Sequence, residues 1–328
     1  MNTTPFSNVQ ATSTSSPELL GDQDRPQLDK TLYALPTGGR ALVLGGGGST
    51  GNAWLIGVIA GLFEAGLDVT TADLTIGTSA GSTAAVQVSG ASPTELLAAT
   101  LVPVPQTRSN AGGPDRPRVR PVVDHMERMR KIIVSASDAA DMRRKVGASA
   151  LEMGSASDGS WQAQWRTVVA SRLPIQQWPE RRILITAVDA GSGESVVFDR
   201  HSGVDLVDAV AASCSSGLPY RIGDGYYIDG GYRSNAENAD LAAGSGRVLV
   251  LAPFGGRSLH PKEWGTDLAT QVDQLRAGGS RVETIFPTSE SGHMFGTNAM
   301  DLSLRPPAAR AGYVQGKDVA RELADFWH

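Results

Sequence analysis

The pattern of apolar and polar residues predicts an alternation of buried strands and amphipathic helices. The runs at 41–44 and 74–76 are short and continuously apolar, as in strands that are covered on both faces. Between them, apolar residues recur at helical spacing from Leu55 to Leu62, and small residues at 80–89 predict a second helix. This order of strand, helix, strand and helix indicates a parallel sheet with right-handed crossovers.

Similar patterns continue to the end of the chain, so we predict an α/β fold. Further strands are expected at 182–189, 195–198, 226–228, 247–251 and 281–286, the first two as a hairpin. Further helices are expected after the capping box at 92–95 and over 122–133, 161–172, 204–212, 268–275 and 307–328. No internal repeat is found.

Two stretches lack this pattern. Residues 1–36 are rich in Ser, Thr, Pro and Asp, which predicts a disordered N-terminal tail ahead of one domain at 37–328. A signal for non-classical export is an alternative role for this tail. Prolines interrupt the pattern after 101, so residues 101–150 are interpreted as an insertion. This insertion is basic, with ten Arg or Lys against five Asp or Glu.

Composition narrows the class of protein. The 328 residues are 41% hydrophobic with a net charge of −5, which fits a globular chain and argues against a dedicated nucleic-acid binder. The single cysteine, Cys214, excludes an internal disulfide and a Cys-based zinc site, and no spacing of His, Asp or Glu suggests a metal. Neither a secretory signal nor an apolar run of about 18 residues is found, so we expect a soluble, cytoplasmic protein. The sequence leaves the oligomeric state open.

The first candidate for chemistry is a Gly-x-Ser-x-Gly sequence centred on Ser79. It follows the predicted strand at 74–76 and precedes a predicted helix, which is the context of a nucleophile elbow. Its glycines, Gly77 and Gly81, permit the close approach of strand and helix that such a turn requires.

The second candidate is the glycine-rich loop that follows the first predicted strand. Consecutive glycine amides can converge on one anionic oxygen, because no side chain blocks the approach. The amides around Gly46, Gly47 and Gly48 are therefore candidates for an oxyanion hole that stabilises the charge developing on an ester oxygen.

The same loop also matches a dinucleotide-binding fingerprint, Gly-x-Gly-x-x-Gly, at 46–51. That fingerprint requires an acidic residue at the end of the second strand, where this chain has Ser79. Asp68 and Asp73 lie before that strand. We therefore favour the oxyanion hole and keep a dinucleotide-binding oxidoreductase as an alternative.

A serine nucleophile needs a base, because its own pKa leaves almost no alkoxide at neutral pH. Ser79, Asp229 and His293 follow the chain order of a conventional triad, so a Ser–Asp–His esterase is one alternative. His293, however, has no predicted strand before it. Asp229 ends a predicted strand, and Gly230 and Gly231 allow a tight turn after it. If Asp229 is buried beside Ser79, its pKa rises and it can act as the base directly.

Three signatures in this order resemble those of the patatin-like phospholipase family: the glycine loop, Gly-Thr-Ser-Ala-Gly and Asp-Gly-Gly. The segments at 211–219 and 238–240 also resemble bacterial members, and the resemblance covers roughly 40–315. It implies a three-layer α/β/α fold with a mostly parallel sheet and no cofactor. It further implies hydrolysis of lipid or phospholipid acyl esters by a Ser–Asp dyad without a catalytic histidine, with Ser79 as nucleophile and Asp229 as base.

One position departs from the family pattern. The family usually has Arg or Lys before the last glycine of the loop, and this chain has Thr50. The candidate oxyanion hole consists of backbone amides, so it does not depend on this side chain, but a positive charge beside it is lost. A weakly active, lipid-binding or regulatory protein is therefore a further alternative.

The basic window at 101–150 is a candidate surface for anionic headgroups and peripheral membrane contact, and a solvated helix face is its alternative.

Overall fold

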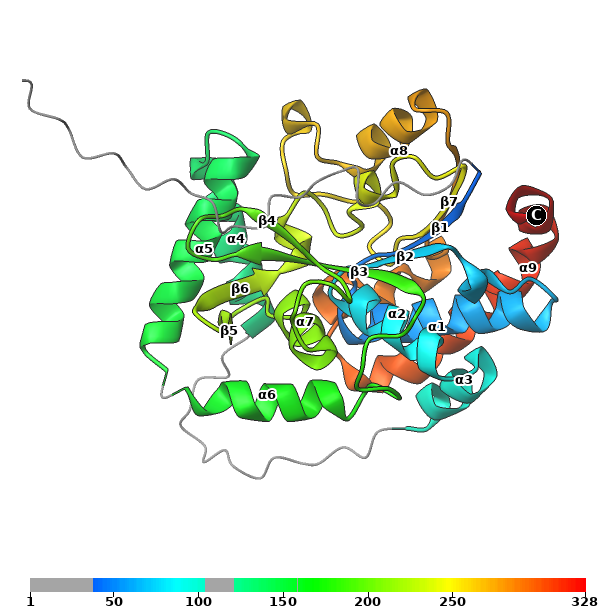
Figure 1. Ribbon diagram of the computed structural model, residues 1–328, viewed down its shortest axis with the longest axis horizontal. Helices are drawn as coiled ribbons and strands as arrows, with labels where there is room; N and C mark the ends of the chain where they lie inside the picture. The colour runs from blue at the N-terminus through cyan, green and yellow to red at the C-terminus, as the bar shows by residue number, and fades with distance from the viewer. Residues whose placement is uncertain (1–37, 104–120, 158) are drawn as a thin grey trace, which may run out of the picture.

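The computed structural model describes residues 38–103, 121–157 and 159–328. Within these residues, eight strands form one sheet (Figure 1). The strands are β1 (Arg40–Leu44), β2 (Leu74–Gly77), β3 (Arg182–Asp189), β4 (Ser195–Phe198), β5 (Tyr220–Ile222), β6 (Gly225–Asp229), β7 (Arg247–Leu251) and β8 (Arg281–Ile285). The tail predicted at 1–36 and the segment 104–120 of the predicted insertion lie outside the described residues.

The strand order is β5-β6-β3-β2-β1-β7-β8, and β4 pairs with β3 beside this path. The five strands from β3 to β8 along this order pair in parallel, whereas β4, β5 and β6 pair antiparallel. The helices are α1 (Gly48–Glu64), α2 (Ala80–Gly90), α3 (Pro93–Leu101), α4 (Pro121–Ser135), α5 (Ala139–Ser155), α6 (Ser160–Ala170), α7 (Leu206–Ser213), α8 (Leu268–Ala277) and α9 (Arg305–Trp327). The predicted α/β class with a mostly parallel sheet is confirmed.

Alternate residues of the strands pack against two helical layers. In β1, Leu42 and Leu44 belong to the core formed with α1, α2, α7 and α9. Ala41 and Val43 face the opposite layer, which contains α8 and a 3-10 turn, η4 (Ala239–Ala242). Figure 1 shows α8 on one side of the sheet and α1, α2 and α9 on the other. The three-layer arrangement expected from the family resemblance is therefore confirmed.

Helices α1 and α9 pack with their backbones in contact, although they lie far apart in the sequence. Gly57 and Gly61 of α1 face the α9 backbone so closely that a Cβ at either position would collide with it. Gly312 and Gly316 of α9 face the α1 backbone in the same way. Glycines four residues apart lie on one face of a helix, so the two pairs form a matched contact.

One α-helix and one strand of the described residues were not predicted from the sequence. Helix α5 contains three consecutive basic residues and buries only a narrow stripe that includes Met142, Val146 and Ala150, so its apolar period is weak. Strand β5 has only three residues, which is too short for an alternating pattern to stand out. No helix of the described ranges is long and apolar enough to cross a membrane.

Candidate active site

Ser79 lies in a strained turn between β2 and α2. Its φ is 52° and its ψ is −114°, in the positive-φ region that non-glycine residues rarely adopt. The turn is tight because a Cβ at Gly81 would collide with the carbonyl group of Leu44, and one at Gly77 would lie 2.6 Å from the Cα of Ser82. Only glycine fits at these two positions.

The sheet register brings Ser79 level with Asp229. Gly77 pairs with Ile185 of β3, and Asp229 pairs with Ala187, two residues further along the same strand. Because Ser79 follows Gly77 by two residues, both side chains reach the same edge of the sheet. The Ser79 hydroxyl donates a hydrogen bond to Asp229 Oδ2 at 2.8 Å. We call these two residues the Ser–Asp pair.

Asp229 is a buried carboxyl group, with an exposed fraction of 7%. Burial raises its pKa from 3.8 to about 6, and hydrogen bonds from the Gly231 amide and the Ser79 hydroxyl oppose this rise. The Gly231 amide donates to Oδ1 at 2.8 Å, which leaves Oδ2 to Ser79. Glycine is required at position 230, between Asp229 and Gly231, because a Cβ there would collide with Thr186.

The glycine loop between β1 and α1 lies against the Ser–Asp pair. A Cβ at Gly46 would be 3.6 Å from the Cβ of Ser79. The Gly46 amide already donates to the carbonyl of Ala236 at 2.7 Å, although the sequence led us to expect it in the hole. The amides of Gly47 and Gly48 have no hydrogen-bond partner within the described residues. These two amides are the ones free to bind an anionic oxygen.

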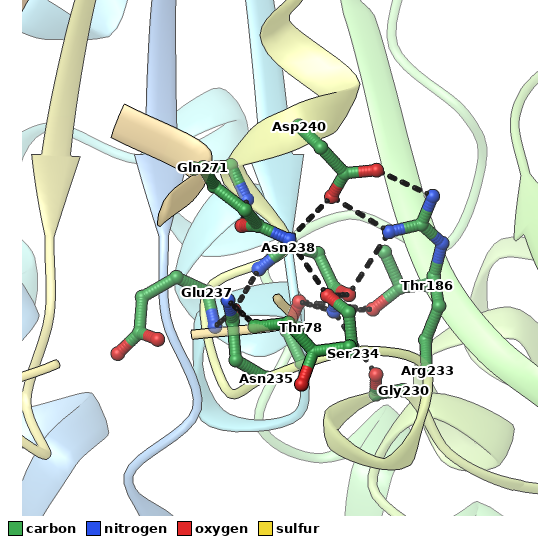
Figure 2. A network of polar contacts seen from close by, with 12 residues as sticks. Thr78, Thr186, Gly230, Arg233, Ser234, Asn235, Glu237, Asn238, Asp240 and Gln271 are labelled. Carbon is green, nitrogen blue, oxygen red and sulfur yellow. Dashed lines mark hydrogen bonds and ion pairs between the residues drawn. The ribbon is translucent and has the colours of Figure 1, made fainter. Parts of the chain in front are cut away.

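Behind the Ser–Asp pair, the side chain of Asn238 connects three segments (Figure 2). Its Nδ2 donates to Thr78 Oγ1 at 3.0 Å, to the Gly230 carbonyl at 3.0 Å and to Thr186 Oγ1 at 3.4 Å. Thr78 precedes the serine of the pair and Gly230 follows the aspartate. One amide group thus connects the two turns that carry the pair.

The Asn238 network is itself held by charged and amide groups. Arg233 forms two hydrogen bonds of 2.8 Å with Asp240 and a third of 3.2 Å with Asn238 Oδ1. Gln271 of α8 donates to Asp240 and to Ser234, as Figure 2 shows. The sequence had not identified Asn238 as a site residue. The only signal was its place in the segment at 238–240, close after the Asp-Gly-Gly sequence.

The structure does not bring His293 to the Ser–Asp pair. His293 is exposed in a 3-10 turn, and its Nδ1 contacts the carbonyl of Glu290 at 2.9 Å. His125 reaches the hydroxyl of Tyr232 at 3.2 Å, and burial lowers its pKa. Within the described ranges, no hydrogen bond joins a histidine to either member of the pair.

The acidic residues considered for dinucleotide binding lie elsewhere. Asp68 accepts a hydrogen bond from the Thr70 amide at 2.9 Å, before β2 begins. Asp73 accepts from the backbone amide of Arg40 at 2.7 Å. Arg40 starts β1, so Asp73 lies at the end of the sheet opposite the glycine loop. In the described part of the chain, no three His, Cys, Asp or Glu side chains gather as a metal ion requires.

Cys214 and its neighbour support the backbone of Ser79. The thiol donates to the Ser79 carbonyl at 3.2 Å, and Ser213 Oγ accepts from the Ser79 amide at 3.0 Å. Burial raises the pKa of the Cys214 thiol to about 11, with a smaller contribution from the Asp229 charge. The thiol therefore stays protonated at neutral pH and serves packing and hydrogen bonding.

The model of the patatin-like phospholipase family matches residues 42–241, so the chain belongs to this family. This membership supports a lipid acyl hydrolase in general terms. A comparison with curated proteins finds no match.

Several solved structures resemble the chain, among them VipD and ExoU. VipD from Legionella pneumophila aligns with a TM-score of 0.39 and 14% identity, over 88% of this chain and 68% of VipD. The type III effector protein ExoU aligns with a TM-score of 0.34 and 16% identity, over 87% of this chain. The chain spans only 54% of the ExoU chain.

Proposed function

We propose that the protein is a serine acyl hydrolase of the lipase or phospholipase A type, and that Ser79 and Asp229 form its catalytic dyad. The observation that carries this proposal is the 2.8 Å hydrogen bond from the Ser79 hydroxyl to Asp229. Burial of that carboxylate, which raises its pKa to about 6, adds support because a more basic carboxylate accepts the serine proton more readily.

The reaction proceeds in two steps. Asp229 Oδ2 accepts the hydroxyl proton as Ser79 Oγ attacks the ester carbonyl, and the amides of Gly47 and Gly48 stabilise the oxyanion. The leaving alcohol takes the proton from Asp229, and an acyl-enzyme remains on Ser79. Asp229 then removes a proton from water, the resulting nucleophile attacks the acyl carbonyl, and the proton returns to Ser79 as the fatty acid leaves. Gly46 supports the loop through its bond to Ala236.

The first test is hydrolysis of a short-chain p-nitrophenyl ester. Ser79→Ala and Asp229→Asn should each lower kcat at least about 10³-fold, because each removes one half of the dyad. Melting temperatures close to that of the wild type would show that both variants fold. His293→Ala is the matched control, and it should retain activity within about twofold.

Three outcomes would contradict the proposal. Full activity in Ser79→Ala or Asp229→Asn would rule out the proposed dyad. Loss of activity in His293→Ala would favour a Ser–Asp–His triad. Wild-type protein that binds lipid but hydrolyses no ester would indicate a regulatory role instead.

A further inference from the structure

The glycine loop carries no charge of its own. Thr50 is fully buried, and its hydroxyl has no hydrogen-bond partner within the described residues. A cation nevertheless lies beside the loop, because Arg305, the first residue of α9, reaches the first turn of α1. Its Nη1 donates to the carbonyl of Ser49 at 2.9 Å and to Ser49 Oγ at 3.1 Å, and Nη2 lies 3.4 Å from Asn52 Oδ1.

These contacts place the Arg305 guanidinium close to the start of α2 as well. The side-chain amide of Asn52 donates to the carbonyl of Ala80 at 3.4 Å, and Ala80 directly follows Ser79. Helix α9 packs on α1 with the two backbones in contact at their glycines, and this close packing positions Arg305 beside the first turn of α1. Arg305 is therefore a held cation and not a mobile surface side chain.

A second arginine is linked to the first through two side-chain amides. The Arg172 carbonyl accepts from Gln87 Nε2 at 3.1 Å, and Gln87 Oε1 accepts from the same Asn52 side chain at 2.9 Å that Arg305 contacts. Arg172 is exposed, and its guanidinium lies over the ring of Trp165 at 5.5 Å. Burial lowers the pKa of Arg305, and the nearby charge of Arg172 lowers it further. Ala80, which contacts Asn52, and Gln87 both belong to α2, so Arg305 and the backbone of Arg172 are both linked to this helix.

Neither arginine has a carboxylate partner in the described part of the chain. No ion pair within 4 Å includes Arg172 or Arg305. Asp301, the acidic residue closest to Arg305 in the sequence on its N-terminal side, accepts hydrogen bonds from Ser303 instead. Two neighbouring cations without a counter-charge repel each other, and an anion that binds between them relieves this repulsion.

The chemistry of guanidinium groups favours a phosphate as that anion. The planar fork of arginine donates paired hydrogen bonds to phosphate oxygens, and such charge-assisted bonds are stronger than neutral ones. The contacts of Arg305 lie one and four residues after Gly48 in α1, at most about 6 Å along the helix axis. In a glycerophospholipid the acyl ester and the phosphate are a few bonds apart on one glycerol unit, so both can be bound together.

We propose that Arg172 and Arg305 form a subsite for the phosphate group of a phospholipid whose acyl ester lies at Ser79. This inference rests on the proposed hydrolase function and adds a preference for phosphate-bearing substrates over neutral acylglycerols.

The test compares two short-chain lipids that differ only in the phosphate, a phosphatidic acid and the diacylglycerol with the same acyl chains, both used as monomers. The double variant Arg172→Gln/Arg305→Gln should lower the ratio of their kcat/KM values at least about tenfold. Arg172→Gln alone, at an exposed position, should lower it in the same direction without a folding risk. Arg310→Gln, an exposed arginine of α9, is the matched control and should leave the ratio unchanged.

A binding measurement separates this inference from the hydrolase proposal. Calorimetric titration of Ser79→Ala protein with the same phosphatidic acid should give an affinity that falls at least about tenfold when both arginines are replaced. An unchanged affinity and an unchanged lipid ratio would overturn the subsite even if esters are hydrolysed. Inorganic phosphate is the third probe. If phosphate alone binds through the arginines while the lipid ratio is unaffected, the site belongs to free phosphate and the headgroup assignment is wrong.

Discussion

The Asp229 carboxyl group lies in surroundings that change its chemistry. A carboxylate in water is a weak base, but one that is withdrawn from water holds its proton more strongly. Asp229 is buried at the end of β6, and among the residues that the structure describes its side chain receives two hydrogen bonds, from Gly231 and Ser79. This environment supports its proposed role as a base without an imidazole.

The pH dependence of hydrolysis should follow Asp229. Only the ionised carboxylate accepts the serine proton, so kcat/KM should rise with pH and reach half of its upper limit near pH 6, where burial has brought the pKa. The measurement is kcat/KM for a p-nitrophenyl ester between pH 4.5 and 8.5. The profile should be unchanged in His293→Ala. A transition that disappears in that variant would assign the base to histidine.

At the scale of secondary-structure elements, the sheet and one loop together position Ser79 and Asp229. Strands β2, β3 and β6 bring the Ser–Asp pair to one edge, because their register sets the level of each residue. The loop after β6 then connects the two turns through Asn238, whose φ of 55° is in the left-handed region that asparagine tolerates. We regard Asn238 as a positioning residue.

Replacing Asn238 should therefore affect the chemical step more than substrate binding. We expect Asn238→Ala to lower kcat about 10- to 100-fold with little change in KM, because the two turns lose their shared donor. Asn238→Asp keeps the size and tolerates the same φ, but it places an acceptor beside the Gly230 carbonyl, so kcat should fall as well. Steady-state kinetics and melting curves measure both effects. If kcat is unchanged in folded variants of both kinds, Asn238 serves stability alone.

The elements differ in how well the sequence predicts them. The helices and strands around the glycine loop and the Ser79 turn were predicted, because each has a strong local pattern of apolar residues. The packing of α9 on α1 was not predicted. Each helix has its own period, but the match of Gly57 and Gly61 with Gly312 and Gly316 depends on tertiary structure. The glycine spacing of four in both helices was the available signal.

At the scale of the whole molecule, the candidate site joins segments from the two ends of the described chain. The sequence indicated Ser79 and Asp229, since each follows a predicted strand and has its own glycine signature. It did not indicate that the Gly46 amide bonds to Ala236, or that Arg305 reaches Ser49 across 256 positions. Both are single contacts between distant segments, and no local pattern encodes such contacts.

Glu237 gives the molecule a pH-dependent stability. Its exposed fraction is 1%, neither carboxyl oxygen has a partner within the described residues, and burial raises its pKa from 4.5 to about 8. Figure 2 shows its carboxyl group pointing away from the Asn238 network. The folded state thus keeps a proton that the unfolded chain has already released, so stability falls as pH rises from about 4.5 to 8.

Removing this ionisation should stabilise the protein at high pH. Glu237→Gln keeps the shape of the side chain, so the melting temperature of the variant should fall less than that of the wild type between pH 5 and pH 8.5. The contribution of Asp229 has the same sign but is present in both proteins and cancels. Glu263→Gln, at an exposed position, is the control. Equal slopes for all three proteins would show that Glu237 is charged or hydrated in the folded state.

The central claim is that Ser79 is a nucleophile activated by Asp229 without a histidine. Covalent labelling by a fluorophosphonate, followed by intact mass and peptide mapping, tests it most directly. We expect one equivalent on Ser79 in the wild type, an equal rate in His293→Ala, no label in Ser79→Ala and a rate at least about 100-fold lower in Asp229→Asn. Labelling at another residue, an undiminished rate in Asp229→Asn, or loss of labelling in His293→Ala would contradict the account.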